Sequence, residues 1–107
     1  MNIKSLQKLC HQIAVEKGFW ENELEGTFTE DMRNNAEMIA LMHSELSEAL
    51  EELRKKHCKM ELVGKELADC VIRILDFCGG RDIDLQKVIE KKIKKNKKRP
   101  YKHNKRF

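Results

Sequence analysis

Residues 45–53 read ELSEALEEL, and residues 66–74 read ELADCVIRI. The two segments match position by position: an acid, an apolar residue, any residue, a second acid and a small residue, then apolar residues at the sixth and ninth positions. Apolar residues at spacings of three and four are typical of an α-helix with one apolar face. The two segments therefore predict two helices, each with a pair of carboxylates beside its apolar stripe.

The helical period continues on both sides of these segments. Apolar stripes of this spacing run through four parts of the chain, at residues 3–13, 32–53, 63–77 and 85–93. Gly18 and the Gly79-Gly80 pair are placed to end two of the helices, and Asp84 is placed to cap the start of the last. The stretch 19–30 loses the period, which indicates a loop. Four helices with short connections favour an all-α, four-helix, bundle-like fold.

The composition indicates a helical domain with a thin core. The chain has 107 residues, one proline and 6% aromatic residues, which disfavours an all-β sandwich or barrel. We predict one domain over residues 1–107, with a basic tail at about 97–107. A chain this short buries only roughly 60–70% of its unfolded surface, so we expect a partner subunit to complete the core. The second helix is expected to bury an apolar stripe formed by Met32, Ala36, Ile39, His43, Leu46, Leu50 and Leu53. Three methionines at helical spacing, Met32, Met38 and Met42, are also expected in the core or at a subunit interface.

The sequence carries no sign of a membrane segment. No apolar run approaches the roughly 18 residues that a membrane helix requires. The first twenty residues also lack the profile of a secretory signal peptide. We therefore expect a cytoplasmic protein that makes no membrane contact.

The net charge of +4 hides an uneven distribution. Residues 91–107 hold ten of the 22 Lys and Arg residues and none of the 18 Asp and Glu residues. Residues 1–90 therefore hold twelve basic against 18 acidic residues, a net charge of −6. An acidic body with a basic tail suits a partner that carries phosphate, either a nucleotide or a nucleic acid.

Glu45, Glu48, Glu66 and Asp69 form the candidate metal site. At about 100° per residue, both acids of each pair fall on the same side of their apolar stripe. If the two helices pack as neighbours, the four carboxylates converge at the margin of the core, where they repel one another unless a cation lies between them. Oxygen ligands of this kind favour Mg²⁺ or Mn²⁺. The alternative is that all four acids are ordinary solvated helix charges.

The two acidic pairs and their 17-residue spacer resemble the ExxE…ExxD signature of the MazG-like nucleotide pyrophosphohydrolases. These proteins belong to the all-α NTP pyrophosphatase superfamily, together with dimeric dUTPases and phosphoribosyl-ATP pyrophosphohydrolases. Further segments are similar to family segments in the family order, and the likeness spans roughly residues 10–103. They are Lys17–Trp20 (KGFW), Arg33-Asn34, His43–Glu51 (HSELSEALE), Lys92–Asn96 (KIKKN) and Arg99–Tyr101 (RPY).

The resemblance implies a four-helix MazG-type fold and a Mg²⁺-dependent enzyme. The reaction would be hydrolysis of a nucleoside triphosphate or its deoxy form at the α-phosphorus, giving the monophosphate and pyrophosphate. By motif position, Glu45, Glu48, Glu66 and Asp69 would ligate the metal, for which Mn²⁺ is also suitable. A carboxylate is then needed as general base, and we select Glu45 or Glu48 as the catalytic candidates. The family's usual dimer, or a tetramer of dimers, would complete the core and share the site between subunits.

The candidate substrate-binding residues lie in three segments. Lys92 and Asn96 share a helix face, and with Arg99 they are placed to hold phosphate oxygens. Aromatic residues in the loop after the first helix are placed to contact a nucleobase, and Trp20 is preferred to Phe19. Arg33 and Asn34 open the second helix and are expected to reach the same pocket. The alternatives are a solvated charge for each basic residue and a cap on the bundle for each aromatic residue.

Two other functions remain open. A non-catalytic helical oligomer would bind nucleic acid or another acidic partner through the basic tail, but the acidic body would repel a duplex. A narrower enzyme would hydrolyse only dUTP or phosphoribosyl-ATP, and the Phe19-Trp20 loop argues against the second of these substrates. A role in clearing non-standard or excess nucleotides is the expected physiological function.

Overall fold

The computed structural model describes residues 1–21 and 34–107. Within these ranges it contains four α-helices and no strand: α1 (Ile3–Glu16), α2 (Asn35–Leu53), α3 (Met60–Gly80) and α4 (Leu85–Lys97). A short 3₁₀ turn, η1 (Tyr101–Asn104), follows the last helix. The prediction of an all-α, four-helix fold is confirmed. None of the described helices combines the length and the apolarity that a membrane crossing needs.

Three helix starts are fixed by side chains that accept hydrogen bonds from the first turn. Asn2 Oδ1 accepts from the Ser5 backbone N–H at 2.8 Å, and the Asn2 N–H donates to Ser5 Oγ at 3.1 Å. Asp84 Oδ1 accepts from the Lys87 N–H at 3.1 Å, as predicted for a cap. Gly18 follows the end of α1 with a φ of +88°, a conformation that glycine adopts without strain. Local sequence signals therefore decide where these helices begin and end.

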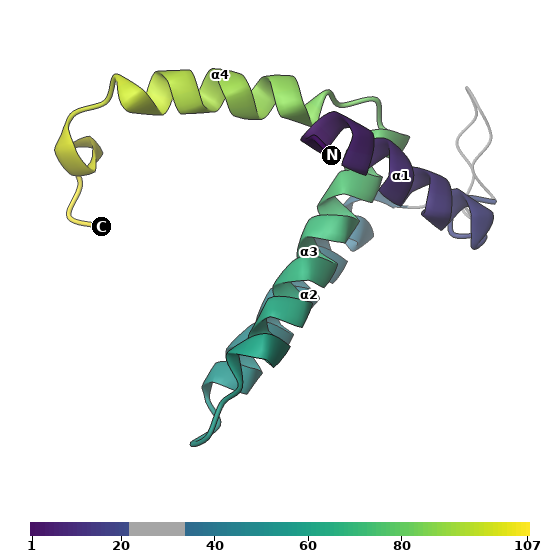
Figure 1. The fold of residues 1–107 in the computed structure, drawn as a ribbon, viewed down its shortest axis with the longest axis horizontal. Coiled ribbons are helices and arrows are strands. Elements are labelled where there is room, and N and C mark those ends of the chain that lie inside the picture. Colours follow the sequence, from purple (N-terminus) through teal and green to yellow (C-terminus); the bar gives the residue numbers. More distant parts are fainter. Residues whose placement is uncertain (22–33) are drawn as a thin grey trace.

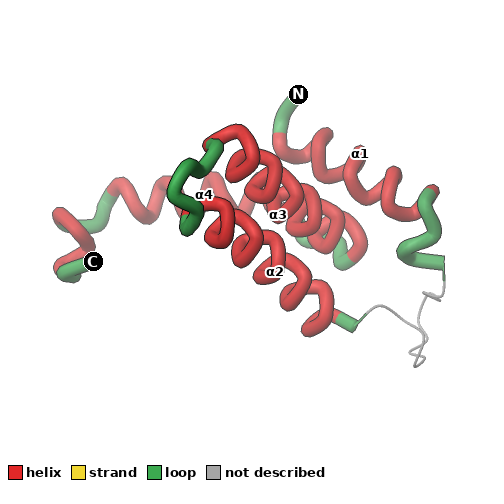
Figure 2. Tube along the Cα trace, turned by 90° about the horizontal axis from the view of Figure 1, so that it is seen from below, coloured by secondary structure: helices red, strands yellow, loops and turns green. Residues whose placement is uncertain are grey.

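Helices α2 and α3 form an antiparallel hairpin, and α1 lies across the C-terminal half of α3 (Figures 1 and 2). The turn between α2 and α3 is closed by the buried Glu52 carboxylate. It accepts from the Lys59 backbone N–H at 3.0 Å and pairs with the Lys55 ammonium at 2.7 Å. These two contacts lower the pKa of Glu52, and they fix the register in which the acids of α2 face α3.

The Gly79-Gly80 pair ends α3 as predicted, and it also allows α1 to approach closely. A Cβ atom on Gly79 would lie 2.6 Å from His11 Cβ, and one on Gly80 would lie 2.3 Å from Trp20 Cη2. Both distances are shorter than carbon atoms tolerate, so only glycine fits at these positions. The pair therefore determines how closely α1 and Trp20 pack against α3.

Helix α4 extends away from the α2–α3 hairpin, in the direction opposite to α1 (Figure 1). Its start is tied to α1 by two hydrogen bonds. The Lys4 N–H donates to Gln86 Oε1 at 2.9 Å, and Gln7 Nε2 donates to the Ile83 carbonyl at 2.8 Å. None of its residues is buried. The basic end of the chain is thus carried on an exposed arm.

The prediction of the buried face of α2 is wrong for the single chain. The buried residues of α2 are Met38, Met42, Glu45, Ala49 and Glu52. The predicted stripe lies one residue further along, and its described members, from Ala36 to Leu53, are exposed, while Met32 lies outside the described residues. Met38 and Met42 are buried, as expected of core residues. The reason is that α3 packs on the side of α2 that carries Glu45, so the apolar stripe is turned by about 100° from the contact.

The exposed stripe of α2 continues onto α3. By helical phase, it lies on the same side of the hairpin as two exposed apolar residues of α3, and on the side opposite to Glu48. We call this surface the leucine face; it consists of Ile39, Leu46, Leu50, Leu53, Leu67 and Val71. An apolar surface of this extent on a small chain is typical of a subunit interface.

Candidate active site

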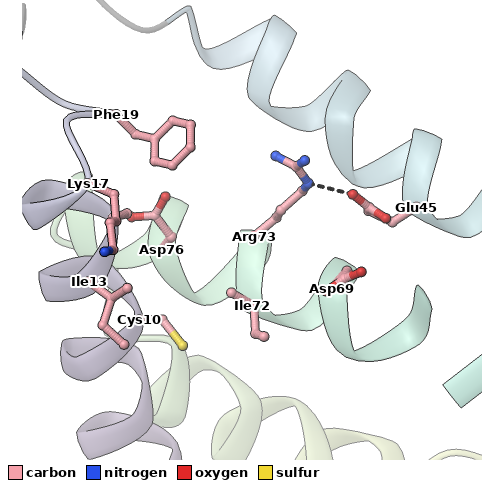
Figure 3. A pocket seen from close by; sticks show the side chains of 10 residues that line it. Cys10, Ile13, Lys17, Phe19, Glu45, Asp69, Ile72, Arg73 and Asp76 are labelled. Atoms are coloured by element: carbon pink, nitrogen blue, oxygen red, sulfur yellow. Dashed lines mark hydrogen bonds and ion pairs between the residues drawn. The ribbon is translucent and has the colours of Figure 1, made fainter. Parts of the chain in front are cut away.

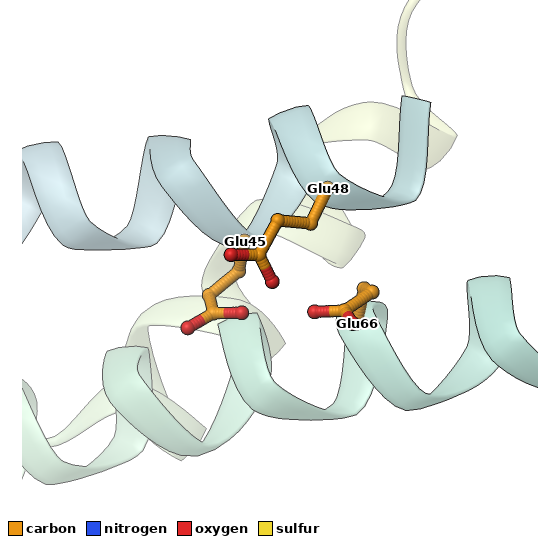
Figure 4. A group of neighbouring side chains, drawn as sticks. All are labelled: Glu45, Glu48 and Glu66. Carbon is orange, nitrogen blue, oxygen red and sulfur yellow. The ribbon is translucent and has the colours of Figure 1, made fainter. Parts of the chain in front are cut away.

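Three of the four predicted metal ligands meet where α2 faces α3. Glu45 and Glu48 come from adjacent turns of α2, and Glu66 comes from α3 (Figure 4). Each offers one carboxylate oxygen, and these three oxygens lie within 4.8 Å of one another. We call this group the carboxylate trio. Its members are graded in exposure, since Glu45 is buried, Glu66 is half-buried and Glu48 is exposed.

Asp69 lies outside this close group. It is exposed on α3, and it lines a pocket to which Glu45 also contributes (Figure 3). Because Asp69 follows Glu66 by three residues, it sits one helical turn nearer to α1. The structure therefore places the fourth carboxylate at the pocket side of the trio.

One buried oxygen of the trio has no hydrogen-bond donor among the described residues. Glu66 Oε2 is buried and has no hydrogen-bond partner among the described residues. An ionised carboxylate only accepts hydrogen bonds, so three such groups facing one another leave a proton or a cation as the remaining partner. The adjacent Glu48 carboxyl, together with burial and Glu45, raises the pKa of Glu66 to about 7. Without a cation, the trio holds a proton near neutral pH.

Arg73 keeps one member of the trio ionised. Its Nε donates to Glu45 Oε1 at 2.9 Å, and this contact is the main cause that lowers the pKa of Glu45 (Figure 3). Arg73 was missed in the sequence analysis. The signal was present, because an arginine inside the apolar stretch VIRIL stands four residues after Asp69 and seven after Glu66, on the same helix face.

The trio fits a hard divalent cation. All of its donors are carboxylate oxygens, which Mg²⁺ and Mn²⁺ prefer, and the unpaired Glu66 Oε2 is the kind of buried atom that a cation satisfies. No histidine or cysteine belongs to the group, which disfavours Zn²⁺.

A pocket of about 370 Å³ adjoins the trio on the side of α1. Its wall combines apolar side chains from α1 and α3 with acidic and basic groups (Figure 3). The lining residues are Cys10, Ile13, Ala14, Lys17, Phe19, Glu45, Asp69, Ile72, Arg73 and Asp76. A volume of this size is in the range of small-molecule sites, and Glu45 belongs both to the pocket and to the trio.

The two loop aromatics differ in their surroundings. Trp20 is 7% exposed, and its Nε1 donates to Asp76 Oδ1 at 2.9 Å. The same oxygen lies 3.0 Å from His11 Nδ1, and the Arg81 guanidinium stands 5.2 Å from the indole centroid. Phe19, in contrast, is 63% exposed and lines the pocket. Trp20 is thus held against α3, and Phe19 is the loop aromatic that borders the pocket.

The remaining candidate residues that the structure describes do not lie at the trio of their own chain. Asn34 is the N-cap of α2, and its Oδ1 accepts from the Ala36 N–H at 2.8 Å. Arg33 lies outside the described residues. Lys92 and Asn96 are exposed on α4, which Figure 1 shows leading away from the hairpin that carries the trio. Arg99 lies beyond them, with Nη1 3.3 Å from His103 Nδ1.

Residues 33–106 match the family model of the MazG nucleotide pyrophosphohydrolase domain, a span that covers well over half of the chain. The chain belongs to the MazG nucleotide pyrophosphohydrolase family. The resemblance found in the sequence is thereby confirmed. The MazG match includes the trio and Asp69, while α1 and Phe19 precede it. Comparison with curated proteins and with solved structures gave no match.

Membership in the MazG family agrees with the chemistry of the trio. MazG domains are typically metal-dependent, and this chain presents an acidic cluster on the two helices that carry the MazG signature. The match also extends through α4, so the arm with Lys92 and Asn96 is part of the MazG domain.

Proposed function

We propose that this MazG protein hydrolyses a nucleoside triphosphate, or its deoxy form, to the monophosphate and pyrophosphate in a Mg²⁺-dependent reaction. The observation that carries the proposal is the carboxylate trio, with its unpaired Glu66 oxygen, at the edge of a ligand-sized pocket. A triphosphate supplies the negative charge that such a metal site attracts, and a base and sugar supply the bulk that the pocket accepts. One domain over residues 1–107 performs this function.

The four acids hold the metal in this proposal. Glu45, Glu48 and Glu66 are ligands, and Asp69 joins them from the pocket side. Bound Mg²⁺, or Mn²⁺ in its place, neutralises phosphate charge and makes the α-phosphorus easier to attack. Loss of the shared proton from Glu66 accompanies metal binding, because ligands must be ionised.

Glu48 is the general base of the proposed reaction. Glu45 is buried and tied to Arg73, and Glu66 is half-buried with a buried Oε2, whereas Glu48 is exposed. A water oxygen forms the new bond to the α-phosphorus while Glu48 takes its proton. The bond between the α-phosphorus and the bridging oxygen breaks, and pyrophosphate leaves with that electron pair. Phe19 and the apolar wall hold the nucleobase and limit entry of bulk water.

The site is completed by a second copy of the chain, as a homodimer or as a homotetramer built from dimers. The leucine face lies uncovered on the side of the hairpin opposite to Glu48. Lys92, Asn96 and Arg99 bind phosphate oxygens in this proposal, although their own chain carries them away from its trio. In this proposal, the oligomer places the arm of one subunit beside the trio of another.

The direct test is pyrophosphate release from a panel of ribo- and deoxyribonucleoside triphosphates with Mg²⁺. Wild-type protein is expected to release monophosphate and pyrophosphate. The panel includes dUTP and phosphoribosyl-ATP, and the nucleotide with the highest turnover identifies the preferred substrate. Glu48→Gln should lower turnover at least about 100-fold, because a positioned base contributes about that much.

Glu51→Gln is the matched control for this substitution. Glu51 lies on the same helix, is exposed and pairs with Arg54 at 2.9 Å, so the exchange removes the same charge away from the trio. Its turnover should equal that of the wild type. A folded oligomer that hydrolyses none of the panel would contradict the proposed function.

The exposed arm supports a second candidate function, which is nucleic-acid binding without catalysis. None of the α4 residues is buried, and the ten basic residues of 91–107 lie on this arm and its tail. Such binding would weaken steeply with salt and would disappear on removal of the tail, with the trio irrelevant. Association with DNA or RNA that survives Glu48→Gln, in a protein without turnover, would favour this function.

A further inference from the structure

Arg73 stands at the point where the carboxylate trio meets the pocket. Its side chain lines the pocket, together with that of Glu45, and is 38% exposed. Figure 3 shows its guanidinium between Glu45 and the phenyl ring of Phe19. A ligand that fills the pocket and reaches the trio must therefore pass this group.

Toward the part of the chain that the structure describes, the guanidinium uses one of its nitrogens. Nε donates to Glu45 Oε1 at 2.9 Å, and no described residue accepts a hydrogen bond from either terminal nitrogen. The two terminal nitrogens form a planar fork that matches the oxygens of a phosphate group. In the exposed Arg54–Glu51 pair, by contrast, a terminal nitrogen makes the contact, and the pair lies far along the hairpin from the pocket.

The other basic residue of the pocket is less well placed. Lys17 lies at the C-terminal end of α1, on the side of the pocket away from Glu45 (Figure 3). Lysine also offers a point charge on a flexible stem rather than a fixed fork. Of the two pocket cations, Arg73 alone adjoins the trio.

We propose that Arg73 is a phosphate-binding residue whose terminal nitrogens grip the polyphosphate of the substrate beside Glu45. The proposal deepens the proposed function, because it assigns the phosphate end of the pocket to this arginine. It gives the ion pair two functions: the Nε contact orients Glu45, and the free fork selects ligands that carry phosphate over the bare nucleoside. No family motif noted in the sequence analysis includes this residue.

The test measures binding rather than turnover. Inorganic tripolyphosphate, which carries the phosphate chain without a base, is titrated into the full-length protein by calorimetry with Mg²⁺ in excess. Salt at about 0.2 M screens the exposed basic tail. Arg73→Gln should weaken tripolyphosphate binding about tenfold to a hundredfold, since it removes a charge-assisted bidentate contact. Arg54→Gln removes an equal charge from another Arg–Glu pair and should bind like the wild type.

A second measurement separates phosphate binding from the orientation of Glu45. The affinity for Mn²⁺ alone, measured by electron paramagnetic resonance, should fall much less in Arg73→Gln than the affinity for tripolyphosphate. Equal losses of both would show that Arg73 acts only through Glu45, and unchanged tripolyphosphate binding would refute any contact with phosphate. Arg73→Lys keeps the charge and serves as a second variant in case Arg73→Gln does not fold. Its affinity for tripolyphosphate should fall roughly threefold to tenfold, because lysine lacks the planar fork.

The outcomes also separate this inference from the proposed function. Failure of the wild type to hydrolyse any nucleotide would contradict the enzyme, yet the comparison of Arg73 and Arg54 variants would still decide whether Arg73 binds phosphate. Turnover by the wild type together with unchanged tripolyphosphate binding in Arg73→Gln would contradict the inference alone.

Discussion

Glu45 and Glu66 lie side by side in the carboxylate trio, yet their surroundings shift their pKa values in opposite directions. Arg73 lowers the pKa of Glu45, whereas Glu48, burial and Glu45 raise the pKa of Glu66 to about 7. Two acids of the same type therefore hold different charges in the metal-free protein near neutral pH. Arg73 accounts for the lowered pKa of Glu45, and the neighbouring Glu48 together with burial accounts for most of the raised pKa of Glu66.

This difference predicts that metal affinity depends on pH. A cation must displace the proton from Glu66, so Mn²⁺ binding should weaken as the pH falls through about 7. One competing proton with that pKa lowers the affinity about tenfold between pH 8 and pH 6. Titration with Mn²⁺, followed by electron paramagnetic resonance at the same two pH values, measures this change in affinity. Glu66→Gln should bind Mn²⁺ more weakly but with little change over this range, and an equally flat wild-type profile would contradict the prediction.

At the scale of helices, the α1–α3 contact depends on glycine. Gly80→Ala would place a methyl group 2.3 Å from Trp20 Cη2, and Trp20 cannot turn away without losing its hydrogen bond to Asp76. We expect a loss of about 1–3 kcal/mol in the free energy of unfolding. Gly64→Ala is the matched control, because no atom lies within 4 Å of its added Cβ.

The control variant should change stability in the opposite direction. Gly64 lies in the interior of α3, where alanine is preferred to glycine by roughly 0.5–1 kcal/mol. Urea unfolding of the two variants beside the wild type measures both effects. If both variants shift equally, the close approach of Trp20 to Gly80 is not what stabilises the loop.

The sequence predicts the helices well because their signals are local. Apolar spacing, caps such as Asp84 and the glycine at position 18 act within one or two turns of the residue concerned. The acidic convergence was also predictable, since equal phase on two neighbouring helices suffices to bring Glu45, Glu48 and Glu66 together. The helix signals need no knowledge of how the elements are placed in space, and the convergence needs only that α2 and α3 pack as neighbours.

The features that the sequence did not predict depend on which faces of the helices pack together. The stripe with Leu46 and Leu50 reads as the core of α2, but the chain buries the face with Glu45 instead. Trp20 reads as a ligand contact, yet it is held by Asp76, which lies 56 residues away in the sequence. The spacing of apolar residues reveals that a face is apolar, and it does not reveal whether the chain itself or a second copy covers that face.

At the scale of the whole molecule, the chain is more extended than a compact domain. Its radius of gyration is 16.9 Å, against about 13 Å expected for this length. The hairpin and the α4 arm form two limbs that diverge from a common corner (Figure 1). Both limbs carry exposed apolar residues, such as Leu50 on the hairpin and Ile93 on the arm. In the proposed oligomer, the acidic body of a second copy would complement the basic arm in charge and would cover both surfaces.

This arrangement predicts that a charge on the leucine face dissociates the protein. Leu50 is 57% exposed in the single chain, so Leu50→Asp should leave the helices intact while it opposes subunit contact. Sedimentation equilibrium should then show monomers where the wild type shows dimers or tetramers. Val15→Asp is the control, because Val15 is an exposed apolar residue of α1 outside the leucine face. A wild-type monomer would contradict the prediction outright.

A site shared between subunits predicts that two inactive proteins restore activity when they are mixed. Glu48→Gln inactivates the trio, and the double substitution Lys92→Ala/Asn96→Ala removes phosphate ligands from the arm. If each trio works with the partner's arm, every mixed dimer contains one site with an intact trio and an intact arm. Random exchange of subunits then restores about a quarter of the wild-type activity. If trio and arm of the same chain work together, both sites of a mixed dimer carry a defect and the mixture stays inactive.

Mixing Glu48→Gln with Glu66→Gln is the matched control, because each trio is then defective whichever arm serves it. Restoration in the first mixture alone is the expected result, and it would explain why α4 leads Lys92 and Asn96 away from the carboxylates of their own chain.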